Sequence, residues 1–237
     1  MARVDIRGVI IPNDYKWFYD WFDEDSTCPR DVQKVIDALK PGEVLDVYVN
    51  SPGGEISSGS EIYTLLRGLP ENVVKIHITG EACSAASVIS MAGWSEMAPT
   101  ALMMVHCVSS YVGGNHTDME HMAETLRTAD QALSTAYKAK TGMTDTEALE
   151  MMEHETWLTA QQAKDRGLVD QIMFEEPEEP MPMVAGPLFR LPTTDQMERV
   201  KALMAKQEAP TEEAIDHTSL DMARAGYSLL CLKERRN

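Results

Sequence analysis

Residues 45–66 read LDVYVNSPGGEISSGSEIYTLL, which joins a short β-branched run to a tight turn and then to an amphipathic stretch. The run over 45–49 has the composition of a strand, and the SPGG turn at 51–54 ends it abruptly. Residues 55–66 place their apolar side chains at helical spacing. A strand followed at once by a helix is half of a βαβ unit, so this stretch predicts a parallel sheet covered by helices.

The same alternation continues on both sides of this unit. Further strands are expected over residues 4–12, 75–79 and 101–107. Further helices are expected over residues 15–22, 29–39, 84–92, 117–140, 144–152 and 159–166. The pattern predicts an α/β fold for the first three quarters of the chain.

The composition changes sharply after Phe174. Residues 175–182 read EEPEEPMP, which combines four acids with three prolines and predicts an extended segment. We therefore assign residues 1–174 to one folded domain, 175–194 to an acidic proline-rich linker and 195–237 to a tail of short helices or partly disordered chain.

The overall charge excludes two classes of partner. The 237 residues carry 21 Lys and Arg against 38 Asp and Glu, a net charge of −17. Binding to nucleic acid or to an anionic membrane surface would need a basic face. The sequence also has no long apolar run and no signal peptide at its start, so we expect a soluble cytoplasmic protein.

Four cysteines are present, and their spacing predicts neither a disulfide nor a metal site. They are Cys28, Cys83, Cys107 and Cys231. None forms a CxxC pair, and Cys83 and Cys107 lie in apolar stretches that are typical of buried reduced thiols. We expect no metal and no cofactor.

Two segments have apolar faces that a single domain could leave exposed. Residues 15–22 hold six aromatic side chains, which predict a core or subunit-contact face, with a ligand-stacking platform as the alternative. The helix over 117–140 carries an apolar stripe at spacings of three and four residues, which predicts a subunit contact or burial within the same chain. The stripe consists of Met119, Met122, Leu126, Ala129, Leu133 and Ala136.

Residues 79–87, TGEACSAAS, have the composition of a nucleophile turn between a strand and a helix. Ser84 would lie at the start of the helix, where the N–H of Ala85 could stabilise an oxyanion. The N–H of Gly53 or Gly54 could be the second donor, and His106 at the end of an apolar strand could be the base. Each feature has a structural alternative: SPGG is also an ordinary helix-entry turn, and a lone histidine is often a buried structural residue.

Taken together, these motifs resemble the proteolytic subunit of the Clp protease (ClpP) and its phage relatives over about residues 3–174. The matching pieces are Asn50–Gly54, Ile62-Tyr63, Gly80–Ser84, His106, Trp157–Ala160 and Gly167–Asp170. The resemblance implies a spiral of βαβ units, as in the ClpP and crotonase folds, with a protruding handle helix that begins near Thr117.

The resemblance also implies a catalytic triad. Ser84 matches the nucleophile and His106 the general base, and Glu155 falls where the better-known ClpP sequences have aspartate. Asp170, or no third member, are the alternatives to Glu155. Ser87, His116 and His154 are the nearest competing residues and rank below these.

The family resemblance further implies an assembly and a substrate site. Gly113 and Gly114 fall where the family has a glycine-bearing strand beside the bound peptide. The implied assembly is a homo-oligomeric ring, typically of seven subunits, with two rings stacked face to face through the handle helices. The substrates would be proteins or peptides.

The residues that follow Ser84 and Glu155 resemble those of phage-type head-maturation proteases. The sequence starts almost directly with the first strand and has a tail over 175–237, so we expect a prohead protease that cuts scaffold or capsid protein without an AAA+ ATPase. The alternatives are an ATPase-coupled housekeeping ClpP, a catalytically inactive ring that serves capsid assembly, and a crotonase-type enzyme that holds an acyl-CoA thioester.

Overall fold

The computed structural model describes residues 2–70, 72–175 and 194–207 of the chain. The chain divides into two units, residues 1–177 and 178–237. The described part of the second unit is one helix, α8 (Thr194–Gln207), and most of the linker and tail predictions lie outside the described residues.

The first unit is built on an eight-stranded sheet with the order β2-β1-β3-β4-β5-β8, and β6 and β7 continue from β4. Every pairing is parallel except β6 with β7. The strands are β1 (Ala2–Ile10), β2 (Ser26–Thr27), β3 (Leu45–Gly54), β4 (Val74–Cys83), β5 (Trp94–Met97), β6 (Leu102–Val105), β7 (Thr156–Thr159) and β8 (Gln171–Ile172).

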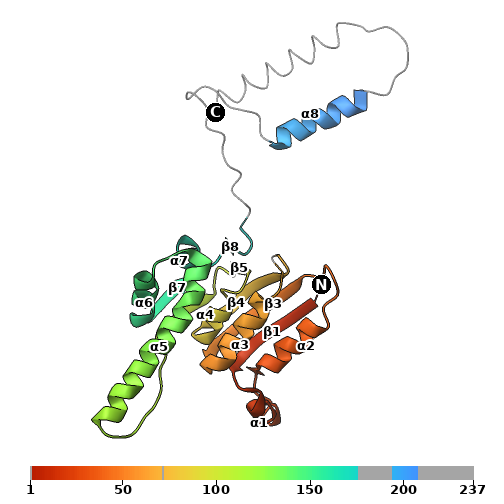
Figure 1. Cartoon of the computed structure of the whole chain (residues 1–237). Coiled ribbons are helices and arrows are strands. Elements are labelled where there is room, and N and C mark those ends of the chain that lie inside the picture. Colours follow the sequence, from red (N-terminus) through yellow and green to blue (C-terminus); the bar gives the residue numbers. More distant parts are fainter. Residues whose placement is uncertain (1, 71, 176–193, 208–237) are drawn as a thin grey trace, which may run out of the picture. The chain divides into compact units, whose positions relative to one another are not determined.

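The helices connect the strands in the expected alternating order, and α2 and α3 lie side by side against the sheet (Figure 1). They are α1 (Lys16–Trp21), which follows the 3-10 turn Asn13–Tyr15, α2 (Pro29–Asp37), α3 (Ile56–Arg67), α4 (Ala85–Ile89), α5 (His116–Thr141), α6 (Asp145–Glu153) and α7 (Ala160–Asp165). The α/β fold predicted from the sequence is confirmed.

The two faces of the central strands differ in chemistry, as the alternation of side chains along a strand requires. The valines and isoleucines of β3 and β4, such as Val47 and Ile78, are fully buried in the core. The other side chains form a polar ladder, in which His77 contacts Asp46 at 2.9 Å and Glu96 at 2.7 Å. The helices therefore cover the apolar face.

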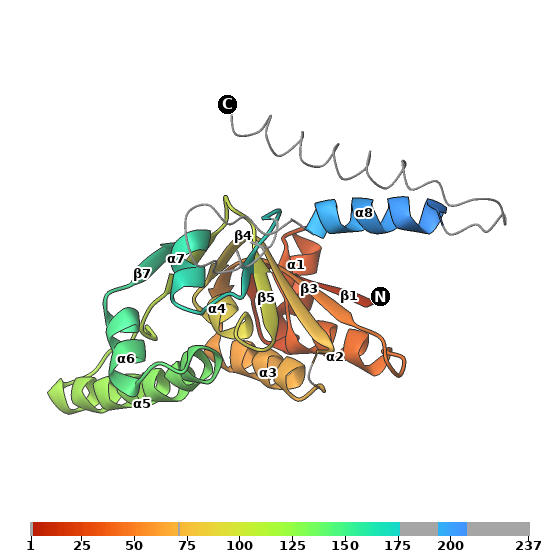
Figure 2. The same cartoon turned by 90° about the horizontal axis from the view of Figure 1, so that it is seen from above.

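The long helix α5 extends beyond the sheet, as Figures 1 and 2 show. Its first half is mostly exposed, including Met119 at 40%, whereas Ala136 and Tyr137 in its second half are buried. The predicted stripe is thus divided: its last part packs within the chain, and its first part is exposed at Met119 and half-buried at Met122 and Leu126. This division is what a subunit contact through the protruding half would need.

The aromatic helix α1 forms where it was expected, but it is not part of the core. Trp17 is 70% exposed and Trp21 is 80% exposed. The rings pack mainly on one another, with Phe18 and Phe22 4.9 Å apart. The interpretation of this face as core is wrong for the single chain, because α1 lies beyond the end of the sheet and contacts mainly β2.

Four strands were not expected from the sequence, namely β2, β5, β7 and β8, because they are too short for a clear period-two pattern. Conversely, residues 106–115 form no strand, so the expected strand at Gly113 and Gly114 is not present in the described chain. None of the described helices has the length and apolar character needed to cross a membrane.

Candidate active site

Ser84 occupies the turn between β4 and α4, with a backbone φ of 54° and ψ of −125°. This positive φ is unusual for a residue with a Cβ and is maintained only where the surrounding structure enforces it. The N–H of Ser84 donates to the carbonyl of Met104 on β6 at 2.9 Å, which ties the turn to the neighbouring strand. The serine thus lies on the strand-to-helix turn expected from the sequence, and its positive φ is a strain that only the structure shows.

His106 lies directly after β6 and faces this serine. Its Nε2 is 2.8 Å from Ser84 Oγ. The contact follows from the sheet, because β4 and β6 pair in parallel with Cys83 opposite Met104 and so end at the same edge. A hydroxyl and an imidazole at this distance form the nucleophile and base pair that acyl transfer requires.

A small cavity of about 70 Å³ opens at this pair. Apolar side chains form much of its wall, from α3, α4 and the second half of α5. Its lining residues include Gly54, Ile56, Ser84, Ala85, Val88, His106, Leu133, Tyr137 and Met152. The cavity could receive a small apolar side chain next to the serine.

The two glycines of the SPGG turn have different surroundings. The N–H of Gly53 donates to Ser51 Oγ at 3.1 Å, so it is already engaged within the turn. Gly54 lines the cavity together with Ala85. An oxyanion in this cavity is therefore better served by Gly54 and Ala85 than by Gly53.

Gly53 has a different role, because it allows the turn to approach the serine closely. Its φ is 96°, and an added Cβ would lie 2.6 Å from the Cys83 carbonyl oxygen and 2.7 Å from Ser84 Cβ. No side chain fits at these distances. The SPGG turn therefore packs directly against the nucleophile turn, and this contact brings the two motifs together.

Glu155 directly precedes β7 and is the chain neighbour of Thr156, which pairs with Val105 next to His106. Its Oε1 nevertheless accepts from the indole N–H of Trp157 at 3.3 Å. In the described chain, no hydrogen bond joins this carboxylate to His106, so the third triad position stays a prediction.

The competing residues have other partners. Asp170 accepts from the N–H of Ser95 at 2.7 Å and from Lys140. His154 is exposed and its Nδ1 bonds the carbonyl of Glu150, while His116 is the exposed first residue of α5. These contacts occupy each group away from the Ser84–His106 pair.

Gly113 and Gly114 lie in the segment that leads into α5. Nothing lies within 4 Å of an added Cβ at Gly113, whereas one at Gly114 would meet the Asp118 carboxylate. An extended segment becomes a strand only when another strand pairs with it, and residues 106–115 have no such neighbour in the described chain. Binding of a peptide substrate to this segment stays a prediction.

Two thiols flank the pair in sequence, and neither is prepared to react. Burial, together with the nearby carboxylate of Glu81, raises the pKa of the Cys83 thiol to about 11. Burial and the charge of Asp130 raise the pKa of Cys107 to about 11 as well. Both stay protonated near neutral pH, so neither thiol competes with Ser84 as a candidate nucleophile. Among the described residues, no cluster of His, Cys, Asp or Glu is arranged to hold a metal ion.

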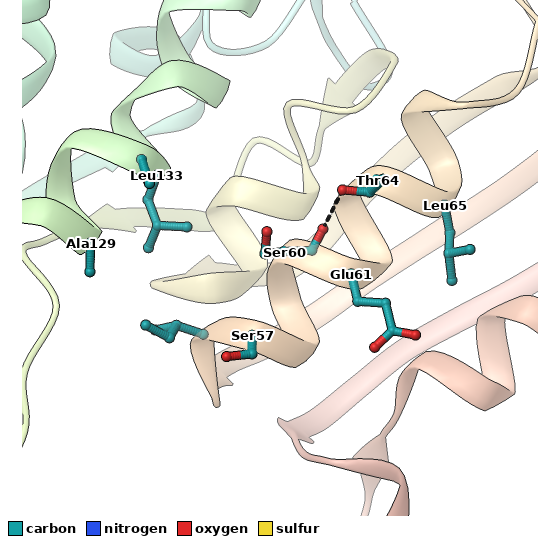
Figure 3. A pocket seen from close by; sticks show the side chains of 9 residues that line it. Ser57, Ser60, Glu61, Thr64, Leu65, Ala129 and Leu133 are labelled. Carbon is teal, nitrogen blue, oxygen red and sulfur yellow. Dashed lines mark hydrogen bonds between the residues drawn. The ribbon is translucent and has the colours of Figure 1, made fainter.

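A larger groove of about 480 Å³ lies beside the site, between α3 and α5 (Figure 3). Ile56 and Leu133 line both this groove and the small cavity at Ser84. Ala129 and Leu133 belong to the apolar stripe of α5. The stripe therefore continues from the exposed half of α5 into the neighbourhood of the active site.

Sequence reasoning did not find Tyr137. Its ring lines the cavity, and its hydroxyl bonds Ser87 at 2.8 Å. Ser87 had been considered only as a competing nucleophile, but it is fully buried and cannot meet a substrate. Only the packing of α5 against α4 brings these two residues together, 50 positions apart in the sequence.

Comparison with known proteins agrees with this geometry. The sequence profile of the family described as Clp protease matches residues 31–176, more than half of the chain. Two relatives from strains of Bacteroides fragilis, each named ATP-dependent Clp protease proteolytic subunit, are 28% identical over 144 residues. These residues are 60% of this chain and 69% and 65% of the two relatives. The chain belongs to the Clp protease family.

Proposed function

We propose that this protein is a serine endopeptidase that hydrolyses peptide bonds through an acyl-enzyme. The observation that carries the proposal is the 2.8 Å contact between His106 Nε2 and Ser84 Oγ at the mouth of a small cavity. Membership of the Clp protease family supports the same chemistry.

The first half of the reaction forms the acyl-enzyme. Ser84 Oγ attacks the peptide carbonyl carbon while its proton passes to His106 Nε2. The negative charge that develops on the carbonyl oxygen accepts hydrogen bonds from the N–H groups of Gly54 and Ala85. The tetrahedral intermediate then collapses, the C–N bond breaks, and His106 returns the proton to the leaving amine.

The second half restores the enzyme. A water molecule attacks the ester carbonyl, and His106 Nε2 accepts its proton. The C–O bond to Ser84 breaks, and His106 gives the proton back to the serine oxygen. The products are the free Ser84 hydroxyl and a peptide with a new carboxylic acid, which releases its proton to solvent, so atoms and charge balance without any cofactor.

Glu155 is our candidate for the residue that orients His106 through Nδ1. The pairing of Val105 with Thr156 brings this part of the chain beside the end of β6, where His106 follows. In this proposal Glu155 leaves Trp157 and turns its carboxylate towards the imidazole ring. Its positive φ of 44° marks a backbone position with a constrained direction.

We further propose that the protein acts as a ring of identical subunits. The aromatic face of α1 is an exposed apolar surface, and the first half of α5 adds the exposed Met119 and the half-buried Met122 and Leu126. Burial of such surfaces between subunits is the general driving force of assembly. The family resemblance favours a heptameric ring or a stacked double ring.

Within this class we favour a head-maturation protease that cuts scaffold or capsid protein. This choice is supported by the residues after Ser84 and Glu155, which resemble those of phage-type proteases, and by the long segment after residue 177. An ATPase-coupled peptidase is the second candidate, and the names of the two relatives favour it. Neighbouring genes for portal and capsid proteins would support the first candidate, whereas an adjacent unfoldase gene would favour the second.

A fluorophosphonate probe tests the peptidase proposal directly. We expect the full-length protein to be labelled and the Ser84→Ala variant to stay unlabelled. Ser60→Ala, an exposed serine of α3, is the matched control and should be labelled like the wild type. Equal labelling of wild type and Ser84→Ala, or no labelling of the wild type, would overturn the proposal.

A further inference from the structure

The carbonyl oxygen of Ser84 accepts more hydrogen bonds than the turn of a helix alone would supply. It accepts from the N–H of Ser87 at 2.9 Å and from the N–H of Val88 at 3.3 Å. The Ser87 hydroxyl adds a third bond at 2.6 Å. Because Ser84 adopts an unfavourable positive φ, contacts to its peptide group help to keep it in that conformation.

The direction of the next hydrogen bond follows from counting protons. A serine hydroxyl has one proton, and that of Ser87 is used on the Ser84 carbonyl, which can only accept. The 2.8 Å contact between Ser87 Oγ and Tyr137 Oη therefore has the tyrosine as donor. A chain of two hydroxyls thus runs from Tyr137 through Ser87 to the peptide of the nucleophile.

This chain is enclosed in the protein. Tyr137 is 1% exposed and Ser87 is fully buried. Burial raises the pKa of the Tyr137 hydroxyl far above its usual value, so it remains a donor across the pH range of any peptidase assay. In such surroundings hydrogen bonds strengthen one another, and an unpaired hydroxyl is costly.

The chain also connects two elements that belong to different parts of the fold. Tyr137 lies in the second half of α5, whose first half extends beyond the sheet. Three residues later, Lys140 Nζ bonds the carbonyl of Gly93, shortly after α4, at 2.8 Å. The base of α5 is therefore fastened to the region of the nucleophile at two points.

We propose that Tyr137 and Ser87 are positioning residues that hold Ser84 in its reactive conformation and link its reactivity to the placement of α5. The inference rests on the proposed function, because it assigns to Ser84 the role of nucleophile. Neither residue needs to touch the substrate with its hydroxyl, and neither exchanges a proton during the reaction.

The test uses the full-length chain and an activated peptide ester, with Tyr137→Phe and Ser87→Ala as variants. Each removes one hydroxyl and leaves Ser84 and His106 in place. We expect the acylation rate constant to fall about tenfold in each variant with KM unchanged, as the loss of one well-placed hydrogen bond implies. The double variant should fall no further than the lower single variant, because both substitutions break the same chain.

Ser90→Ala and Ser134→Ala are the matched controls. Both serines are buried, and each donates to a carbonyl of its own helix, Ser90 to Ala86 and Ser134 to Gln131. Their variants should lose thermal stability to a similar degree and keep acylation within about twofold of the wild type. The comparison separates a positioning effect from a general loss of stability.

The outcomes are distinct. Wild-type acylation rates in both Tyr137→Phe and Ser87→Ala, or losses no larger than those of the controls, would overturn the inference. The peptidase proposal would still stand if labelling of the wild type depended on Ser84. Absence of labelling in the wild type would remove the proposed function and this inference with it. If Ser87→Ala fails to fold, the nearly isosteric Tyr137→Phe decides the question alone.

Discussion

The carboxylate of Glu155 accepts a hydrogen bond from the indole N–H of Trp157 at 3.3 Å. Glu155 directly precedes β7, whose Thr156 pairs with Val105, the residue before His106. The carboxylate is thus engaged with Trp157, while His106 Nε2 lies 2.8 Å from Ser84 Oγ.

The first prediction concerns this carboxylate. Glu155→Gln should lower the acylation rate by about 100-fold or more, because a neutral amide stabilises an imidazolium poorly. Trp157→Phe removes the competing donor and should maintain or raise the rate. Stopped-flow acylation with an activated ester measures both. Near-normal turnover in Glu155→Gln would exclude Glu155 as the orienting group.

The second prediction concerns the contact between the SPGG turn and the nucleophile turn. Gly53→Ala should abolish labelling of Ser84, because the added methyl would meet Ser84 Cβ at 2.7 Å. Gly42→Ala is the matched control, since Gly42 also has a positive φ, of 79°, but has open space around its Cβ position. The control should lose about 1 kcal/mol of stability and keep its labelling. Labelling of Gly53→Ala at the wild-type rate would contradict this view of the turn.

The third prediction concerns the two buried thiols. Their pKa values are raised from 9.0 to about 11 in the folded state, so folding favours their protonated forms. This stabilisation is complete below pH 9 and is lost as the pH rises towards 11, because the unfolded chain releases these protons first. Thermal unfolding should show Tm falling over this range.

The variant Cys83→Ala, Cys107→Ala should flatten that pH dependence. Alkylation by iodoacetamide at about pH 8 should be slow for both thiols in the folded protein, since the thiolate is the reactive form. Fast alkylation of either thiol under native conditions would show that its environment differs from the one described.

The fourth prediction concerns assembly. Met122→Glu together with Leu126→Glu places two charges on the exposed half of the α5 stripe and should shift the protein towards smaller species, because buried unpaired charges are costly. Arg127→Glu, an exposed position on the same helix, is the control and should leave the assembly unchanged. Multi-angle light scattering gives the masses. A monomeric wild type at micromolar concentration would be incompatible with the ring.

The fifth prediction concerns substrate choice. A cavity of about 70 Å³, whose wall includes Ile56, Val88 and Leu133, should favour a small aliphatic side chain before the cleaved bond and disfavour an aromatic one. The preference should reach about tenfold or more in kcat/KM, as is common for small changes in a fitted pocket. Met152→Ala enlarges the cavity and should reduce the preference for small side chains. Equal rates for alanyl and phenylalanyl esters with the wild type would argue against this cavity as the subsite.

Much of the fold could be predicted because its signals are local. The β-branched run at 45–49, the SPGG turn and the apolar spacing of α3 are readable in one stretch, since strand, turn and helix each depend on neighbouring residues. The strand-to-helix turn at Ser84 was predictable for the same reason, whereas its positive φ was not. Short strands such as β5 and β7 were not, because they form only where a partner strand is already present.

The amino-acid sequence alone determined the order of strands and helices, the nucleophile turn and the pairing of serine with histidine as candidates. Only the tertiary structure decided which groups meet. His106 reaches Ser84, Gly53 packs against the serine turn while Gly54 lines the cavity, and the Tyr137 hydroxyl bonds Ser87. It also decided that the aromatic rings of α1 stay exposed. The physical reason is that local propensity depends on neighbours in the chain, whereas contacts between distant side chains depend on how the sheet and helices pack.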